Sequence, residues 1–167
     1  MPGSIPPVSR DFVKITYKTT ITVDEVNAIR QSMGWRQIHP EQQQANIDGN
    51  TLTIAAYDGG TAVAMAGLRW NDGSFANMDI LLNPAYQNNE IENEFVARIC
   101  SFLRGKLKPG FGIQLDMNVR GGQEALYESL GFVSATPENS GIPMRICLMD
   151  QIELTDTLFK QMGFKEE

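Results

Sequence analysis

One aspartate lies inside an otherwise apolar segment and is the first residue whose position suggests chemistry. Asp79 interrupts residues 75–82, whose composition is typical of a strand in a hydrophobic core. A carboxylate in such a strand costs free energy unless it has polar partners. It could accept a proton as a general base, directly or through water, or serve only as a structural hydrogen-bond acceptor. Asp72 in a turn and Asp116 at a strand edge are poorer candidates for a base.

The start of the longest expected helix is the second such place. The unpaired N–H groups and the positive dipole end of a helix N-terminus can hold an anion. Here two acids, Glu90 and Glu92, fall in the first turn, and Glu94 follows. Asn89 as N-cap with Glu92 at position N3, three residues later, would form a capping box, in which the helix satisfies its own N–H groups. The residue types alone fit either an anion-binding site or a helix whose first N–H groups are capped by its own side chains.

Other residue types that often do chemistry are sparse. Cys100 and Cys147 lie far apart in apolar surroundings, which is typical of buried thiols in a reducing cytoplasm. The single histidine, His39, precedes a proline and is expected to be an ordinary loop residue. A disulfide or metal site would need more supporting ligands than these, so we expect neither.

Charge and hydropathy exclude two classes of partner. The 167 residues suit a single domain, and their formal net charge is -6. An acidic surface repels phosphate backbones, which argues against nucleic acid, whereas a cationic amine fits this field better. No run approaches the roughly 20 apolar residues that a membrane span requires, and the proline-rich start lacks the apolar part of a signal peptide. We therefore expect a cytoplasmic protein without membrane or nucleic-acid partners.

The elements that must position Asp79 form a mixed sheet. Strands expected over 52–57, 62–70 and 75–82 are joined by Asp58-Gly59-Gly60 and Asn71-Asp72-Gly73, which favour an antiparallel meander. The longest helix follows, with apolar residues at helical spacing from Ile91 to Leu103, and a strand over 111–117 completes a parallel crossover. The expected fold class is α/β in the broad sense (α+β), with a mixed, mostly antiparallel central sheet flanked by helices.

Smaller elements complete the expected domain, which covers residues 11–150. They are a strand near Ile15, a helix capped by Thr22 or Asp24, a short helix over 41–48, a helix from Gly121 to Leu130, an extended segment at 132–133 and a last strand over 142–148. Residues 1–10 form a flexible N-terminal segment in this interpretation, and residues 151–167 a weakly helical C-terminal tail.

Several segments, taken in order, resemble N-acetyltransferases of the GNAT superfamily. The strand exit is similar to that family's hydrophobic-x-Pro sequence followed by Arg or Gln, and reads Asp79-Ile80-Leu81-Leu82-Asn83-Pro84-Ala85-Tyr86-Gln87. The family's Tyr-x-x-x-Gly-Phe signature resembles Ala125-Leu126-Tyr127-Glu128-Ser129-Leu130-Gly131-Phe132. Weaker matches are Arg30-Gln31-Ser32-Met33-Gly34-Trp35 and the segment from Gly141 to Met144. The resemblance covers the chain from about Ile21 to Leu148.

The resemblance implies an enzyme that moves an acetyl group from acetyl-CoA to a primary amine of a small molecule. It implies that the strand over 75–82 parts from its neighbour and pairs with the pantetheine arm, while the diphosphate binds at the following helix N-terminus. The cofactor-binding residues would then be Ile80, Leu81, Leu82, Gln87, Asn88, Asn89, Glu90, Ile91, Glu92 and Asn118.

The same resemblance assigns catalytic and substrate-binding roles. Tyr127 matches the family tyrosine that can protonate the leaving thiolate, and Asp79 is the candidate base. Trp35 and Arg69 could line the substrate pocket. Many small members of this family pair through their C-terminal strands, so a homodimer that uses the tail from Asp150 is a further expectation.

One departure from the family pattern favours an alternative function. The pattern Gln/Arg-x-x-Gly-x-Gly/Ala here reads Gln87-Asn88-Asn89-Glu90-Ile91-Glu92, with glutamates at both small positions. Side chains occupy the space that glycine leaves open. At about 6 Å and an effective dielectric near 20, each like-charge pair with a phosphate costs on the order of 3 kcal/mol. The alternative is a catalytically inactive GNAT-like domain that binds a ligand or a protein and has lost its pyrophosphate site.

Overall fold

The computed structural model describes residues 14–142 and residue 144. The expected N-terminal segment 1–10, most of the last strand over 142–148 and the tail over 151–167 lie outside the described residues. In chain order the elements are β1 (Ile15–Lys18), α1 (Val23–Ser32), α2 (Pro40–Asp48), β2 (Leu52–Asp58), β3 (Thr61–Trp70), β4 (Phe75–Leu82), η1 (Pro84–Tyr86), α3 (Glu90–Arg104), β5 (Gln114–Asp116), α4 (Glu124–Ser129) and α5 (Pro137–Ser140).

The first helix begins and ends as its sequence predicts. Thr22 is the N-cap: its hydroxyl accepts the Glu25 N–H at 3.2 Å, and the Glu25 carboxylate accepts the Thr22 N–H at 2.9 Å. This is a complete capping box. The helix is followed by Gly34, whose φ of 77° is a conformation that glycine adopts without strain. Val26 and Ile29 lie on the helix face that packs against the sheet.

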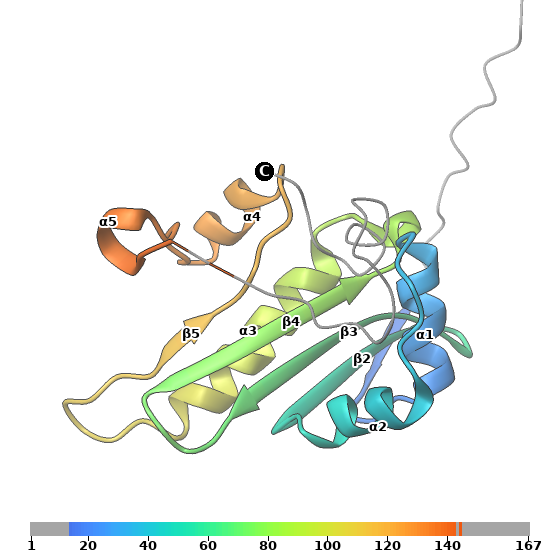
Figure 1. Ribbon diagram of the computed structural model, residues 1–167, viewed down its shortest axis with the longest axis horizontal. Helices are drawn as coiled ribbons and strands as arrows, with labels where there is room; N and C mark the ends of the chain where they lie inside the picture. The colour runs from blue at the N-terminus through green and yellow to red at the C-terminus, as the bar shows by residue number, and fades with distance from the viewer. Residues whose placement is uncertain (1–13, 143, 145–167) are drawn as a thin grey trace, which may run out of the picture.

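The sheet has the strand order β1-β2-β3-β4-β5 (Figure 1). The first three pairings are antiparallel. Tight turns join β2 to β3 and β3 to β4, whereas α1 and α2 lie between β1 and β2. The β4–β5 pairing is parallel, because α3 carries the chain back across the sheet before β5 begins. The predicted mixed, mostly antiparallel sheet flanked by helices is therefore confirmed.

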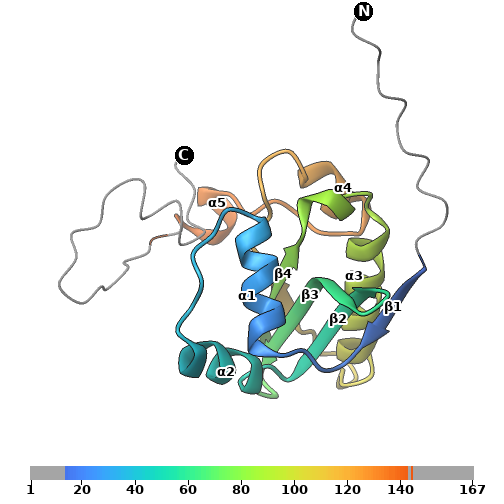
Figure 2. The same cartoon turned by 90° about the vertical axis from the view of Figure 1, so that its right-hand side faces the viewer.

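Helices cover both faces of the sheet and produce two cores (Figures 1 and 2). On the α3 side, Phe95 and Ile99 are fully buried among residues of β2, β3 and β4. On the α1 side, Val26 and Ile29 form a second cluster with side chains of β2 and β3. Successive residues of a strand point to opposite faces, so Asp79 and Leu81 share the α1 face, whereas their neighbours in β4 pack towards α3.

Two segments that the sequence predicts to be extended differ in the structure. One strand is shorter than predicted, and the other segment forms no strand. β5 covers three residues rather than 111–117, and Phe111 lies outside it with 77% of its surface exposed. The Phe111 N–H donates to the Lys108 carbonyl at 3.0 Å, so a local turn takes the backbone group that a longer ladder would need. The segment at 132–133 forms no strand, and Val133 is 85% exposed. The short helix α5 was not expected.

The described residues also bear on metal and membrane binding. Within these ranges no helix combines the length and apolarity needed to cross a membrane. No three His, Cys, Asp or Glu side chains in this part of the chain are grouped as metal ligands. Cys100 is a free, partly buried thiol in α3, while Cys147 lies outside the described residues.

Candidate functional site

The strands β4 and β5 pair at one end and separate at the other. Their register joins Phe75 to Gln114, Ala76 to Leu115 and Asn77 to Asp116. Beyond this point β4 continues to Leu82 and pairs with β3 alone among the described residues. The outer edge of this half of β4 therefore has backbone groups that an extended ligand can bond like an added strand. We call this opening the β4–β5 splay.

A small cavity lies in the β4–β5 splay, between the two faces of the sheet. Its volume is about 20 Å³, which is room for roughly one water molecule. Side chains from β4, α3, α4 and the segment between β5 and α4 line it: Ile80, Leu82, Glu92, Met117, Asn118, Val119, Arg120, Gln123 and Tyr127. The cleft is narrow in this conformation, so a ligand entering the splay must displace some of these side chains.

Glu92 is a buried acid in this cavity. Only 1% of its surface is exposed, and neither carboxylate oxygen has a hydrogen-bond partner among the residues that the structure describes. Burial raises the pKa of Glu92, while its own backbone N–H and the charge of Arg120 act in the opposite direction. The nearby N–H makes no hydrogen bond of acceptable geometry with the carboxylate. Glu92 therefore presents an unsatisfied acceptor to whatever enters the splay.

The capping box that the residue types allow at the start of α3 does not form. Asn89 is the N-cap, but its φ of 70° is left-handed and its side chain makes no capping hydrogen bond. An N-cap that binds its helix has an extended backbone, and the left-handed conformation turns the Asn89 side chain away. Instead, the Asn88 Oδ1 accepts the Glu90 N–H at 3.2 Å. Helix capping therefore does not explain why a glutamate stands at position 92.

The predicted cofactor-binding residues fall into three groups. The side chains of Ile80, Leu82, Glu92 and Asn118 meet in the cavity of the splay. Gln87, Asn88, Asn89 and Glu90 are exposed around the start of α3. The remaining two point elsewhere: Leu81 packs on the α1 side of the sheet and Ile91 is buried in the α3 core. These two could contact a ligand only through their backbone.

Tyr127 enters the cavity from α4. It is 3% exposed, and its ring packs edge-on against Phe132 at 5.8 Å between centroids. Gly131, with a φ of 96°, reverses the chain so that the Phe132 N–H donates to the Tyr127 carbonyl at 3.0 Å. Burial raises the pKa of Tyr127 to about 12, the charge of Glu92 adds to this rise, and that of Arg120 opposes it.

Arg120 connects the cavity to the opposite face of the sheet, and our sequence reasoning missed it. One of its guanidinium nitrogens lies 3.3 Å from the Met33 sulfur, and the guanidinium carbon is 5.2 Å from the centre of the Trp35 ring. Arg30 lies at the same distance from that ring. Burial lowers the pKa of Arg120, while Tyr127 and Glu92 oppose this. No pattern marks position 120, because only the fold brings it to Trp35.

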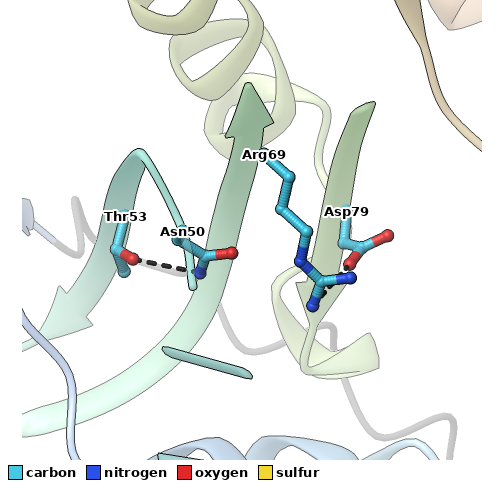
Figure 3. Close-up of polar contacts among 4 residues, drawn as sticks. All are labelled: Asn50, Thr53, Arg69 and Asp79. Carbon is cyan, nitrogen blue, oxygen red and sulfur yellow. Dashed lines mark hydrogen bonds and ion pairs between the residues drawn. The ribbon is translucent and has the colours of Figure 1, made fainter. Parts of the chain in front are cut away.

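Asp79 and Arg69 lie side by side on the α1 face of the sheet (Figure 3). Their nearest nitrogen and oxygen are 3.9 Å apart, and their side chains are 60% and 48% exposed, respectively. The premise that Asp79 is buried in an apolar strand is therefore wrong: strand alternation buries its neighbour Met78 and partly buries Ile80, but it leaves Asp79 exposed. A base at this position would be open to solvent and substrate.

Gly67 leaves room for the polar side chain of Asn50 beside Asp79 on this face of the sheet. It is the β3 residue opposite Asp79, and the Asn50 side chain lies over it. Figure 3 shows the Asn50 Nδ2 donating to the Thr53 Oγ1, at 3.1 Å. A Cβ at position 67 would lie 2.6 Å from that nitrogen, so a glycine is needed for Asn50 to stay in place.

The fold that these elements define is that of the GNAT N-acetyltransferases. A protein of unknown function from methicillin-resistant Staphylococcus aureus, described as a probable acetyltransferase, matches with a TM-score of 0.69 and 16% identity, over 79% of this chain and 99% of the other. A GNAT-family acetyltransferase from Streptococcus pneumoniae matches with a TM-score of 0.60 and 17% identity, over 84% and 100%.

A third similar structure contains a ligand. It is yncA, a candidate acetyltransferase from Salmonella typhimurium, solved with its cofactor acetyl-CoA; the TM-score is 0.54 and the identity 16%, over 73% of this chain and 81% of the other. No family model and no curated protein matches the sequence. At these identities the likeness shows the fold, and the resemblance seen in the sequence is confirmed at that level.

Proposed function

We propose that the protein moves an acetyl group from acetyl-CoA to a primary amine of a small molecule. The observation that carries this proposal is the β4–β5 splay, with the phenol of Tyr127 buried beside it. The free edge of β4 fits an amide-containing arm, because such an arm can pair with a strand. The fold is also that of yncA, which was solved with acetyl-CoA.

In this proposal Tyr127 supplies a proton to the leaving thiolate. Its pKa of about 12 keeps the phenol protonated near neutral pH. The same value makes it a weak acid towards a thiolate, whose conjugate acid titrates near about 8.5. Because the charge of Glu92 contributes to the high pKa, displacing that carboxylate from the cleft makes Tyr127 a stronger acid.

The α1 face of the sheet is the proposed acceptor side. Asp79, exposed and next to Arg69, can accept the amine proton directly or through water. Arg30 and Arg120 flank the Trp35 ring, and positive charge there disfavours a protonated amine. The attacking amine must be neutral, so this charge favours the reactive form. Trp35 and Arg69 keep their proposed role as lining residues of the acceptor site.

An acetylation assay with a matched pair of tyrosine variants tests the proposal. Tyr127→Phe should lower kcat by about a hundredfold or more and leave acetyl-CoA affinity nearly unchanged, because it removes a proton donor and little volume. Tyr17→Phe is the control, since Tyr17 packs on Phe95 from β1 and does not line the cavity. Equal turnover of the Tyr127→Phe variant and the wild type, when chemistry limits the rate, would remove Tyr127 as the acid.

A second candidate function is a catalytically inactive domain that binds a ligand or a protein partner. The specific observation that favours it is Glu92, which fills a cleft with room for little else. This candidate predicts no acetyl transfer to any amine. It also predicts that replacing Glu90 and Glu92 together by glycine creates acetyl-CoA binding that the wild type lacks, because the rest of the splay is intact.

A further inference from the structure

We propose that the protein recognises its donor through the acylated pantetheine arm, and that the phosphates of coenzyme A gain no binding free energy at the start of α3. This inference rests on the proposed acetyl transfer and goes beyond it, because it names the part of the thioester donor that the protein reads. The observations that carry it are the buried Glu92 carboxylate, which has no hydrogen-bond partner among the described residues, and the Glu90 N–H, which already donates to the Asn88 side chain.

The N-terminus of α3 offers few free donors to an anion. The Glu90 N–H donates to the Asn88 Oδ1 at 3.2 Å. The Glu92 N–H faces the carboxylate of its own side chain, which it affects electrostatically. Of the first three N–H groups of the helix, one is therefore hydrogen-bonded to the Asn88 side chain and another lies beside the carboxylate of Glu92 without a hydrogen bond. A diphosphate consists of acceptor oxygens alone, so it would have to displace Asn88 from the first and approach Glu92 at the second.

Both orientations of the Glu92 side chain oppose a diphosphate. Pointing inwards, as in this structure, it occupies the β4–β5 splay. Pointing outwards, it would join Glu90 at the helix start and place two carboxylates where the phosphates must lie. Two cations could offset this charge, but both have other contacts: Arg98, two turns further along α3, pairs with Glu94 at 2.6 Å, and Arg120 contacts Met33 and Trp35.

A pantetheine arm has the opposite chemistry and suits the same residues. Its amide N–H and hydroxyl groups are donors, and the arm is uncharged. The free edge of β4 can bond its amides, and a buried carboxylate without partners is stabilised by any N–H that reaches it. The arm therefore satisfies Glu92, whereas a diphosphate repels it.

Three thioester donors carry the same acylated arm but differ in the phosphate-bearing groups attached to it. Comparing them measures what those groups contribute to recognition. Acetyl-CoA, S-acetyl-4′-phosphopantetheine and S-acetylpantetheine are compared with one amine, and kcat/KM is measured by thiol release. We expect values within about threefold of one another, because the phosphates add no net binding free energy. A preference of about a hundredfold or more for acetyl-CoA overturns this inference and leaves the acetyl transfer intact. No turnover with any donor overturns both.

Charge-removing variants provide the second readout. Replacing Glu90 and Glu92 by glutamine should raise the preference for acetyl-CoA over S-acetylpantetheine by at least about tenfold, because the repulsion of the phosphates is removed. Glu94→Gln is the matched control: it removes a charge from the same helix, but Glu94 does not line the cavity. An unchanged preference in the double variant overturns the inference. If the double variant fails to fold, Glu90→Gln alone repeats the test at an exposed site, with an expected shift of about threefold.

Discussion

The helices α1 and α3 start with similar sequences but very different structures. Each has a residue able to cap, followed three positions later by a glutamate: Thr22 with Glu25, and Asn89 with Glu92. At α1 both hydrogen bonds of the capping box form. At α3 the N-cap is left-handed and neither forms. The same local signature therefore gives a closed helix start in one place and an open one in the other.

The two glutamates show what this difference means energetically. Glu25 accepts hydrogen bonds from the Thr22 N–H and the Tyr57 hydroxyl, both at 2.9 Å. Burial acts to raise the pKa of Glu25, but these bonds outweigh it and the pKa is lowered. Glu92 is more deeply buried, has no such bonds, and its pKa is raised. The first acid stabilises the fold, whereas the second is held at a cost, as groups at functional sites often are.

Glu25→Ala should have the largest effect on stability. It removes two hydrogen bonds to a partly exposed carboxylate, so the free energy of unfolding should fall by about 2 kcal/mol, less than for a fully buried group because solvent screens the charge. Urea unfolding of the variant and the wild type measures the loss. Glu25→Gln, which keeps the shape, should lose about half as much. A loss as small as that of an ordinary surface substitution would contradict the role assigned to the capping box.

Glu92→Gln should raise the free energy of unfolding, and the size of this gain should depend on pH. The folded-state pKa of Glu92 lies above its ordinary value of 4.5, so the folded protein holds this proton more tightly than the unfolded chain does. The stability it contributes is fully present below about pH 4.5 and is lost as the pH rises through the folded-state pKa. The variant should therefore be more stable than the wild type by about 1 to 2 kcal/mol near pH 7, and the gain should shrink towards pH 4.

The control for this experiment is Glu90→Gln, which lies in the same turn of α3 but is exposed. It should lose about 0.3 kcal/mol near neutral pH, because an acid at a helix start favours the helix dipole. Urea unfolding at several pH values measures both variants. If Glu92→Gln is destabilising at neutral pH, Glu92 has partners that the account does not include.

Asn89→Gly should have a smaller effect than Glu25→Ala or Glu92→Gln, with the opposite sign to that of Thr22→Gly. Glycine relieves the left-handed backbone at position 89, where no cap is lost, so stability should rise by about 0.5 kcal/mol. Thr22→Gly removes a working cap from an extended backbone and should lower stability by about the same amount. Thermal unfolding of the two variants measures this contrast. Equal signs would mean that the two helix starts are alike after all.

Local rules predicted most of the fold because most elements obey them. The glycine-containing turns after β2 and β3 specify hairpins, and the capping residues of α1 mark its start. The limits of β5 depend instead on the turn that binds the Phe111 N–H, which strand alternation does not reveal. Asp79 was taken as buried because the strand reads as apolar, but only one face of that part of β4 is covered.

The candidate site was less predictable, for two different reasons. The burial of Glu92 has a signal in the sequence, because it precedes Phe95 by three positions and Ile99 by seven on the apolar face of α3. The capping-box pattern at Asn89 offers a second explanation for the same glutamate, so the sequence alone does not decide between them. Arg120 has no signal at all, since its contacts with Met33 and Trp35 join segments that lie far apart in the chain. Local patterns cannot show such contacts.

The central claim is that the β4–β5 splay accepts an acylated arm. Calorimetric titration with acetyl-CoA tests it most directly, because binding must occur whatever the acceptor amine is. The account predicts saturable binding in the micromolar range. No heat at millimolar acetyl-CoA would contradict it and leave a domain with the GNAT fold and a permanently closed cleft.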